Sequence, residues 1–505
     1  MSHSRIVDQF GSPYPSGGNG QFSRLLSKYD AAQTTTDNML HWANADAMSA
    51  DAAASTEVRK KIRERARYER ANNSYCMSMV ETIAGDVIGS GPRIQVRTGH
   101  KDSDRAIERA FFRWGRAVRL GHKMRIMRKA KAVDGEAFAI FRRNKRTGVP
   151  VQLDLNIVEC DRVTNPTITS FTETTDGIHY DRWGNPSEYC VLAHHPGETA
   201  WGGGFGNEYS WVPANLVLHA YRVDRSEQHR GVSEIAPALR LFSQLRRYTL
   251  AVLAAAETAA DFAAVISSPA NPDPVGFGPH GTESTSIEPN AMDVFELAQR
   301  MVTVLPEGYQ LGQIKAEQPV TTYGEFKREI LAEAFAAMVM PFNVGAHDSS
   351  DFNFASGKLD RLGYGRLAQL EQCDWEDVVV FPVFRTWAAW AISIPGYLPV
   401  DGLPPIETWD LDCYWDGLDD IDPEKAANAS ATELGTFQTT HQRLWAEKGL
   451  DWEYQQETAS ESLGLTVDEF RKRLADKLLG PDVSAIPQPQ GNGNAQTQDR
   501  QATRT

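Results

Sequence analysis

The carboxylates best placed for chemistry in this sequence gather in one polar stretch. Asp348, Asp351 and Asp360 lie close together along the chain, and three carboxylates could bind a divalent ion or act as general acid and base. A metal-dependent nuclease is the enzyme that such a cluster would suit. Aspartates that form turns or cap helices explain the same pattern more simply. We therefore expect no metal here, and the nuclease remains an alternative hypothesis.

The motifs of the common catalytic classes are absent from the sequence. A phosphate-binding loop needs GxxxxGK[ST], and the only Gly-Lys pair, Gly357-Lys358, has Phe352 where the first glycine must stand. Gly231-Val232-Ser233 lacks the second glycine of a serine-hydrolase elbow, because Ile235 occupies that place. His194-His195 does not fit the HExxH pattern of a zinc hydrolase. We expect no enzymatic activity and no cofactor.

Length and composition exclude several other classes. The chain has 505 residues, of which 41% are hydrophobic and 23% charged, so it can fold into several domains with real cores. It has 66 acidic against 52 basic residues, a net charge of −14, which excludes a protein that wraps phosphate with a basic surface. Five scattered cysteines without a CxxC predict reduced thiols. With no signal-peptide pattern and no long apolar run, we expect an intracellular protein without membrane contact.

One segment departs from the acidic average. Between residues 113 and 132 the chain has no acidic residue and carries eight bases: Arg113, Arg116, Arg119, Lys123, Arg125, Arg128, Lys129 and Lys131. Such a stretch could bind nucleic acid, or it could be a solvated or intersubunit helix face. The sequence leaves both interpretations open.

The hydrophobic periodicity predicts a mostly helical α+β fold. A long helix is expected over 58–87, with bases in a stripe on its first half, and another over 106–132 with a break at Gly121. Ser233 is expected to cap a helix that runs to 266. Further helices are predicted at 322–340, at 358–380 with a bend at Pro382 before 392, and within 422–479. Strands are predicted at 94–96, 137–141, 151–158, 189–192, 216–221, and as a pair at 302–305 and 310–314.

Several segments together resemble the lambda-like portal family of tailed bacteriophages. They occur in the family's order between about residues 30 and 475, with helices between them. The segments are Leu40-His41-Trp42, Ser49-Ala50-Asp51, Arg63-Glu64-Arg65-Ala66-Arg67, Arg70-Ala71-Asn72-Asn73, Val87-Ile88-Gly89-Ser90-Gly91, His219-Ala220-Tyr221-Arg222, Gln228-His229-Arg230-Gly231-Val232-Ser233, Pro341-Phe342 and Asn353-Phe354-Ala355-Ser356. Trp387 and Trp390 also fit the family.

This resemblance implies a structural protein. About twelve copies would form a ring at one capsid vertex, and double-stranded DNA would pass through it, without sequence preference, during packaging and ejection. The partners implied are the terminase large subunit, a head-completion or adaptor protein, and the major capsid or scaffold protein. The chain would assemble in the host cytoplasm and remain in the virion. Another head–tail connector scaffold is the remaining alternative, although such adaptors are usually shorter.

The resemblance also implies a domain order. It places an N-terminal arm at 1–50, a wing with the β-rich part at 51–232, stem helices at 233–266 and 321–340 around a clip at 267–320, a tunnel loop at 341–356, a wing helix and return segment at 357–421, a crown-like helical region at 422–480 and a disordered tail at 481–505. The residues expected to face DNA in or beside the tunnel loop are Asn343, His347, Asp348, Ser349, Ser350, Asp351, Asn353 and Lys358.

Overall fold

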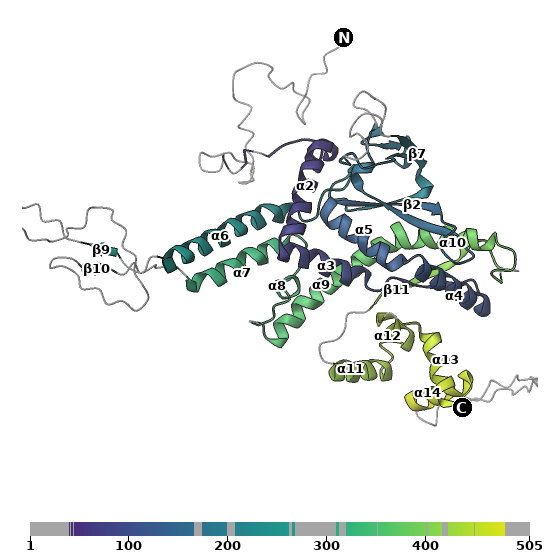
Figure 1. Cartoon of the computed structure of the whole chain (residues 1–505). Coiled ribbons are helices and arrows are strands. Elements are labelled where there is room, and N and C mark those ends of the chain that lie inside the picture. The colour runs from purple at the N-terminus through teal and green to yellow at the C-terminus, as the bar shows by residue number, and fades with distance from the viewer. Residues whose placement is uncertain are drawn as a thin grey trace, which may run out of the picture. The chain divides into compact units, whose positions relative to one another are not determined.

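The computed structural model in Figure 1 describes residues 40, 42–43, 45–165, 174–198, 208–261, 265–267, 310–312, 320–350, 352–399, 402–416, 423–448 and 450–479. The predicted tail (481–505), most of the arm (1–50) and most of the clip (267–320) lie outside these residues. The chain divides into two compact units, Met1–Ala53 and Ala54–Thr505. The first contains the short helix α1 (Ala50–Ala53), and everything below concerns the second. Among the described helices, none combines the length and apolarity needed to cross a bilayer.

Two helices occupy the stretch predicted as one helix over 58–87. α2 (Thr56–Asn72) and α3 (Ser74–Ile88) meet at Asn73, whose backbone is extended and whose side chain accepts hydrogen bonds from the N–H groups of Tyr75 and Cys76. The prediction of one continuous helix is therefore wrong. An asparagine side chain that caps a new helix competes with continuation of the old one.

The predicted second helix is also divided, and its break falls slightly earlier than expected. α4 (Lys101–Ala117) and α5 (Leu120–Asp134) are separated by Val118 and by Arg119, which has a left-handed φ of 55°. Gly121 lies inside α5, where a Cβ atom would collide with the carbonyl oxygen of Ser90. That glycine permits a close approach of α5 to the chain after α3, and it does not break the helix.

A three-stranded antiparallel sheet packs on α5, with the order β3-β2-β8. Its strands are β2 (Glu136–Arg143), β3 (Leu153–Val158) and β8 (Val217–Tyr221), and Phe138 of the central strand pairs with Val158 and His219. Six consecutive residues of β2 are buried, because both of its faces are covered.

A second antiparallel sheet has the order β4-β5-β6-β7, with strands Thr174–Thr175, Ile178–Tyr180, Pro186–Leu192 and Tyr209–Pro213. Tyr189 and Val191 of β6 share a small apolar core with Phe138 and Val158 of the first sheet. The predicted strands of the β-rich region are confirmed by these two sheets. A third pairing joins β1 (Arg93–Arg97) antiparallel to β11 (Asp410–Tyr414).

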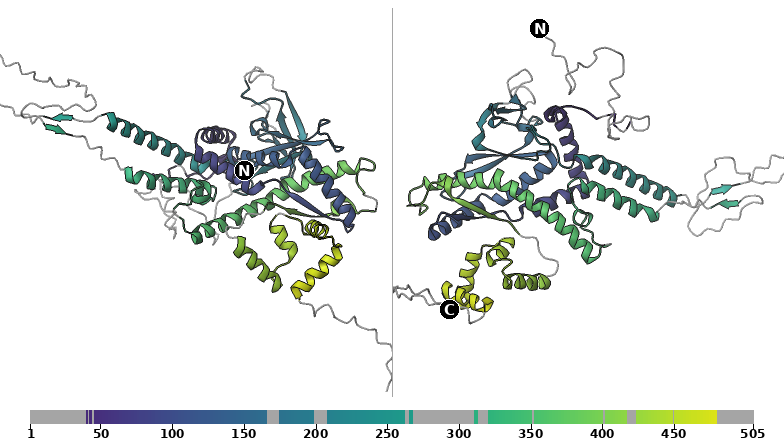
Figure 2. Two further views of the ribbon diagram at one scale, coloured as in Figure 1. Left: turned by 60° about the horizontal axis from the view of Figure 1, so that its bottom comes forward. Right: turned by 180° about the vertical axis from the view of Figure 1, so that it is seen from behind.

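Two long helices form an antiparallel pair that runs away from the sheets, as Figures 1 and 2 show. They are α6 (Leu239–Asp261) and α7 (Val320–Ala336). Ser233 does not cap α6 as predicted, since its hydroxyl donates to the carbonyl oxygen of Ala132, 3.1 Å away, and a 3₁₀ turn at Ala236–Ala238 precedes the helix. Beyond α6, β9 (Val265–Ser267) pairs with β10 (Gln310–Gly312); the strand predicted at 302–305 lies outside the described residues.

The chain then passes through the one-turn helix α8 (Phe342–Gly345) into α9 (Phe354–Trp375) and α10 (Phe381–Ile392). The bend between α9 and α10 is a π-helical turn at Glu376–Val380. Pro382 stands in the first turn of α10, directly after the π-helical turn, and its ring nitrogen cannot donate a helical hydrogen bond there. Phe384 and Trp387 of α10 pack edge-on against Phe111 of α4.

The region predicted to be helical between 422 and 479 contains four short helices. They are α11 (Pro423–Gly435), α12 (His441–Glu447), α13 (Trp452–Leu463) and α14 (Val467–Leu479). Asp451 caps α13 by accepting a hydrogen bond from the N–H of Glu453, 3.0 Å away. The described residues therefore confirm the predicted α+β class with mostly helical structure.

Candidate functional site

The polar segment that follows α7 contains the residues predicted to contact DNA. Pro341 has an extended backbone and starts α8, which ends at Gly345. A Cβ atom on Gly345 would lie 2.8 Å from the ring of Phe335 in α7. Only glycine fits this contact, so α8 is packed directly on the end of α7.

Two neighbouring helices hold the inner side of this segment. The Arg328 guanidinium of α7 lies over the rings of Phe342 and Phe352, with its central carbon 4.9 and 5.4 Å from their centroids. From α3, the Ser78 hydroxyl donates to the Gly345 carbonyl oxygen at 2.9 Å. These contacts are cation–π and hydrogen-bond interactions. The segment is therefore a supported element, held from two sides.

The outer side of the segment presents polar groups to solvent. His347, Asp348, Ser349 and Ser350 are exposed. Ser350 donates to Asp348 Oδ1 through its backbone N–H at 3.0 Å and its hydroxyl at 2.6 Å. The Ser350 hydrogen bonds lower the pKa of Asp348, so this carboxylate stays charged. His347 adopts a left-handed φ of 53° and its Nε2 lies 3.1 Å from Thr82 Oγ1 of α3.

The remaining predicted residues of this set have different surroundings. Asn353 caps α9 by accepting from the N–H of Ser356 at 2.8 Å, and Lys358 is exposed in the second turn of that helix. Asn343 is half-buried, and its Oδ1 has no hydrogen-bond partner among the described residues. Asp351 lies outside the described residues. Asn343 therefore differs from the prediction that every residue of this set is exposed to DNA.

The nuclease hypothesis gains no support from the described residues. Asp348 and Asp360 do not belong to a group of three potential metal ligands there, and the one such group is Glu159, Asp161 and His195. His195 Nδ1 accepts the backbone N–H of Gly197 at 2.9 Å, so a neutral imidazole carries its proton on Nε2, the atom nearest the two carboxylates. A metal ion would need the lone pair of that nitrogen, so the group is better described as a close contact between a histidine N–H and two carboxylates.

Arg63, one base of the stripe on α2, points inward to a buried carboxylate. Glu136, at the start of β2, is fully buried and accepts bidentate hydrogen bonds from the Arg230 guanidinium at 2.7 and 2.8 Å. Arg63 of α2 lies 3.3 Å from the same carboxylate, and His219 Nε2 lies 3.1 Å from it. Burial alone would raise the pKa of Glu136, but Arg230 and His219 lower it to well below its ordinary value. Burial lowers the pKa of His219, which favours the neutral ring.

A second buried network accounts for part of the basic segment between residues 113 and 132. Arg128 contacts Glu234 at 2.8 Å and Glu371 of α9 at 2.7 Å, and Lys131 contacts Glu371 at 2.8 Å. Lys123 and Lys129 also form ion pairs within the chain. These bases stabilise the fold, so the nucleic-acid interpretation of the segment retains only its exposed end at Arg113, Arg116 and Arg119.

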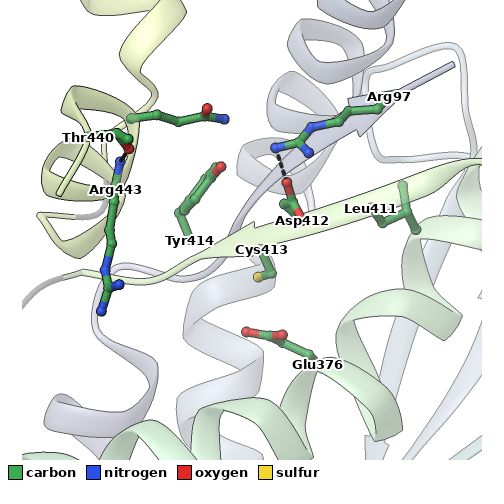
Figure 3. A pocket seen from close by; sticks show the side chains of 9 residues that line it. Arg97, Glu376, Leu411, Asp412, Cys413, Tyr414, Thr440 and Arg443 are labelled. Atoms are coloured by element: carbon green, nitrogen blue, oxygen red, sulfur yellow. Dashed lines mark hydrogen bonds and ion pairs between the residues drawn. The ribbon is translucent and has the colours of Figure 1, made fainter. Parts of the chain in front are cut away.

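An open cavity lies beside β11 and α12, as Figure 3 shows. Its volume is about 520 Å³, and Arg97 and Asp412 form an ion pair across its edge. Burial raises the pKa of Glu376, although the Trp415 indole donates to its carboxylate at 2.6 Å. Burial also raises the pKa of the Cys413 thiol, which makes this cysteine a poor nucleophile. The cysteine that lines this cavity is therefore not an activated nucleophile.

Comparison with known families decides the identity. Residues 36–372 match the family model described as phage portal protein, lambda family. The chain belongs to the lambda family of phage portal proteins. It is a structural portal protein and a component of the virion, as the sequence motifs implied. Arg230 and Gly231, which carry part of that resemblance, lie in the buried network around Glu136.

Comparison with curated protein sequences gives no match. Among solved structures, a chain of the neck of an empty gene transfer agent particle has a TM-score of 0.39 and 13% identity, and covers 76% of this portal protein and 92% of that chain. A chain of the native gene transfer agent virion has a TM-score of 0.40 and 15% identity, and covers 77% and 93%. A chain of the native neck computed with C12 symmetry has a TM-score of 0.38 and 14% identity, and covers 77% and 94%. These similarities are too low to carry an argument about this chain.

Proposed function

We propose that this portal protein closes into a ring of about twelve copies at one capsid vertex and that double-stranded DNA passes along its axis. Family membership supports this proposal. The observation that carries it is a leucine face on α9. Tyr364, Ala368 and Trp375 pack that helix on the core, whereas leucines on the opposite side are exposed: Leu359, Leu362, Leu367 and Leu370. An apolar face of this kind marks an interaction site.

The DNA would meet few fixed cations. B-DNA carries one charge per ~1.7 Å of axis, so a lysine-lined wall would hold the duplex by releasing counterions at each contact. A chain with a net charge of −14 would, on average, bind the duplex only weakly through such electrostatic contacts. The exposed polar residues His347, Asp348, Ser349 and Ser350, with Lys358 nearby, would touch the duplex weakly and without sequence preference. Asn353 and Asn343 would then support the loop.

The domain order implied by the family is part of this proposal. α6 and α7 would be the two stem helices, the residues between them the clip, and α11 to α14 the crown-like region. The clip would contact the terminase large subunit and later a head-completion or adaptor protein, and the outer surface the major capsid or scaffold protein. The ATP chemistry of packaging would belong to the terminase, and the portal would supply no catalytic residue and no cofactor.

A deletion tests the loop assignment. Removing residues 348–353 should reduce packaging or retention of DNA in capsids, because the exposed polar surface beside the duplex is lost. Ring assembly should persist, since the supporting contacts of Phe342 and Gly345 are retained. Native mass spectrometry of the variant provides the control. Normal DNA content in capsids that contain the shortened ring would show that this segment does not serve the DNA.

A further inference from the structure

The second half of α4 carries a row of arginines that faces solvent. Arg109, Arg113 and Arg116 follow one another at spacings of four and three residues, so they lie on one side of the helix. All three are exposed. Phe111 and Trp114 are buried and occupy the opposite side, which fixes this orientation. The row is therefore a solvent-facing surface of the folded chain.

Arg119 extends this row past the end of α4. It lies between α4 and α5, is exposed, and has a left-handed φ of 55°, which is uncommon for a residue with a long side chain. Lys123, one turn further on, forms an ion pair with Asp154 of β3, and the Asn144 side-chain amide donates to the same carboxylate at 2.9 Å. These contacts hold the turn between β2 and β3 beside the start of α5, close to Arg119.

The turn between β2 and β3 adds two further bases. Lys145 and Arg146 are exposed there, and the Arg146 backbone N–H donates to Asn144 Oδ1 at 2.9 Å. The Trp114 indole of α4 donates to the carbonyl oxygen of Leu153, the first residue of β3, at 2.9 Å, so α4 is joined directly to this hairpin. We call the six exposed bases the basic surface: Arg109, Arg113, Arg116, Arg119, Lys145 and Arg146.

The basic surface is not neutralised within the part of the chain that the structure describes. None of its six bases forms an ion pair there, whereas the neighbouring Arg105 and Lys123 do, with Glu457 and Asp154. The sequence has no acidic residue between 109 and 133. Six positive charges are thus concentrated on one surface of a chain whose net charge is −14. Such a concentration is typical of a surface that binds a polyanion.

The chemistry of the basic surface favours phosphate over an acidic protein. A guanidinium group binds phosphate oxygens through paired hydrogen bonds. Arg109 and Arg116 are about 10 Å apart along α4, and one strand of B-DNA presents about three phosphates over that length. An acidic protein would gain most of its affinity from apolar pockets beside the charges. Phe112 is the exposed apolar side chain of this face, and the Arg116 guanidinium already lies over its ring, 5.9 Å from the centroid.

We propose that the basic surface binds the phosphate backbone of double-stranded DNA outside the channel of the ring. α4 and the α6–α7 pair lie at opposite ends of the part of the chain formed by α2 to α10, as Figures 1 and 2 show. The basic surface is therefore separate from the helices proposed to surround the moving duplex. Bases that hold DNA do not oppose translocation there, because no duplex has to slide past them. This contact goes beyond the proposed function, which places DNA on the axis.

A closed circular duplex tests the basic surface, because it cannot thread through a preassembled ring. Its binding to the full-length chain is measured by filter retention between about 50 and 200 mM NaCl. With about six phosphate contacts, the logarithm of the affinity should fall by about 5 for a tenfold rise in salt, so the affinity should drop about 10³-fold over this range.

Two double variants with the same change of charge locate the contact. The chain with R113Q and R116Q should bind the circle at least tenfold more weakly at the lower salt concentration, and its salt slope should decrease by about 2, because two phosphate contacts are lost. The chain with K60Q and R65Q loses two exposed bases of α2, so it is the matched control and should bind as the unmodified chain does. Urea unfolding of both variants shows that they are folded.

Each adverse outcome overturns a stated part of the proposal. Equal binding by the two variants, or no binding of the circle at the lower salt concentration, overturns the basic surface as a DNA contact. Poly-L-glutamate should not displace the circle at equal charge concentration, and displacement would instead indicate a surface for acidic proteins. The ring is tested separately: a chain that binds the circle but never assembles would refute the proposed function and leave this surface standing.

Discussion

The buried pair of Glu136 and Arg230 predicts a large loss of stability when one partner is removed. Both side chains are within 1% of full burial, and they are joined by two short charge-assisted hydrogen bonds. The substitution R230A leaves the Glu136 carboxylate buried with Arg63 at 3.3 Å, His219 at 3.1 Å and the Gly231 backbone N–H at 3.3 Å beside it. Removing one partner of a buried ion pair costs about 3–5 kcal/mol. We expect the unfolding free energy at pH 7 to fall by an amount in that range.

The pH dependence identifies the cause of this loss. In the unmodified chain the pKa of Glu136 is lowered, so its charged form contributes stability above the unfolded value of about 4.3, and this contribution is lost only as the pH falls through the lower folded value. Without Arg230, burial dominates and raises the pKa of Glu136 in the folded state. Protonation then relieves the buried charge, so the deficit of R230A should shrink as the pH is lowered from 7 to 5.

Urea unfolding followed by tryptophan fluorescence at both pH values measures these effects. R222A is the matched control, since Arg222 pairs with Asp224 on the surface with 45% of its side chain exposed. Exposed pairs contribute about 0–1 kcal/mol, so this variant should unfold almost as the unmodified chain does. A loss below about 1 kcal/mol for R230A, or a deficit that does not change with pH, would refute the assigned role of the pair.

Three further substitutions test individual structural claims. N73A should lower the unfolding free energy by about 1 kcal/mol in urea melts, because it removes the cap of α3; no change would show that the cap contributes nothing. G231A should lower the melting temperature strongly, since a Cβ there would collide with the Gly135 carbonyl oxygen; a normal melting curve would contradict that close approach. Burial raises the pKa of Glu108 to about 7, so the native chain loses stability as the pH rises from about 4.3 to 7. E108Q should therefore become progressively more stable than the unmodified chain over that range, and a constant difference in urea melts would count against the buried carboxylate.

The strands and most helices could be predicted because their signals are local. The apolar run at 137–141 and the turn residues that bound it are enough to indicate β2, and Pro423 marks the start of α11. The break at Asn73 also had a local signal, since asparagine followed by serine and an apolar stretch is typical of a helix start. The absence of proline and glycine between residues 58 and 84 favours one helix instead, and this hides the break.

The long-range pairings could not be predicted in the same way. Nothing near Arg63 in sequence indicates that Glu136 and Asp161 will neutralise it, so its stripe looks like a solvated helix face. Ser233 fits the pattern of a helix cap, but a carbonyl oxygen from Ala132, distant in sequence, competes for its hydroxyl. Capping rules describe only neighbours along the chain, and tertiary contacts override them.

The residues predicted to face DNA were also chosen on a local signal that tertiary packing partly overrides. Polarity alone selected Asn343 together with Asp348 and Ser350, yet the one-turn helix α8 leaves Asn343 half-buried while the others are exposed.

Electron microscopy of the purified full-length chain tests the central claim most directly. The proposed portal should appear as rings with a central hole, and twelve copies of a 56.1 kDa chain would weigh roughly 670 kDa. Single compact particles of one chain at every concentration, with no ring among them, would contradict it.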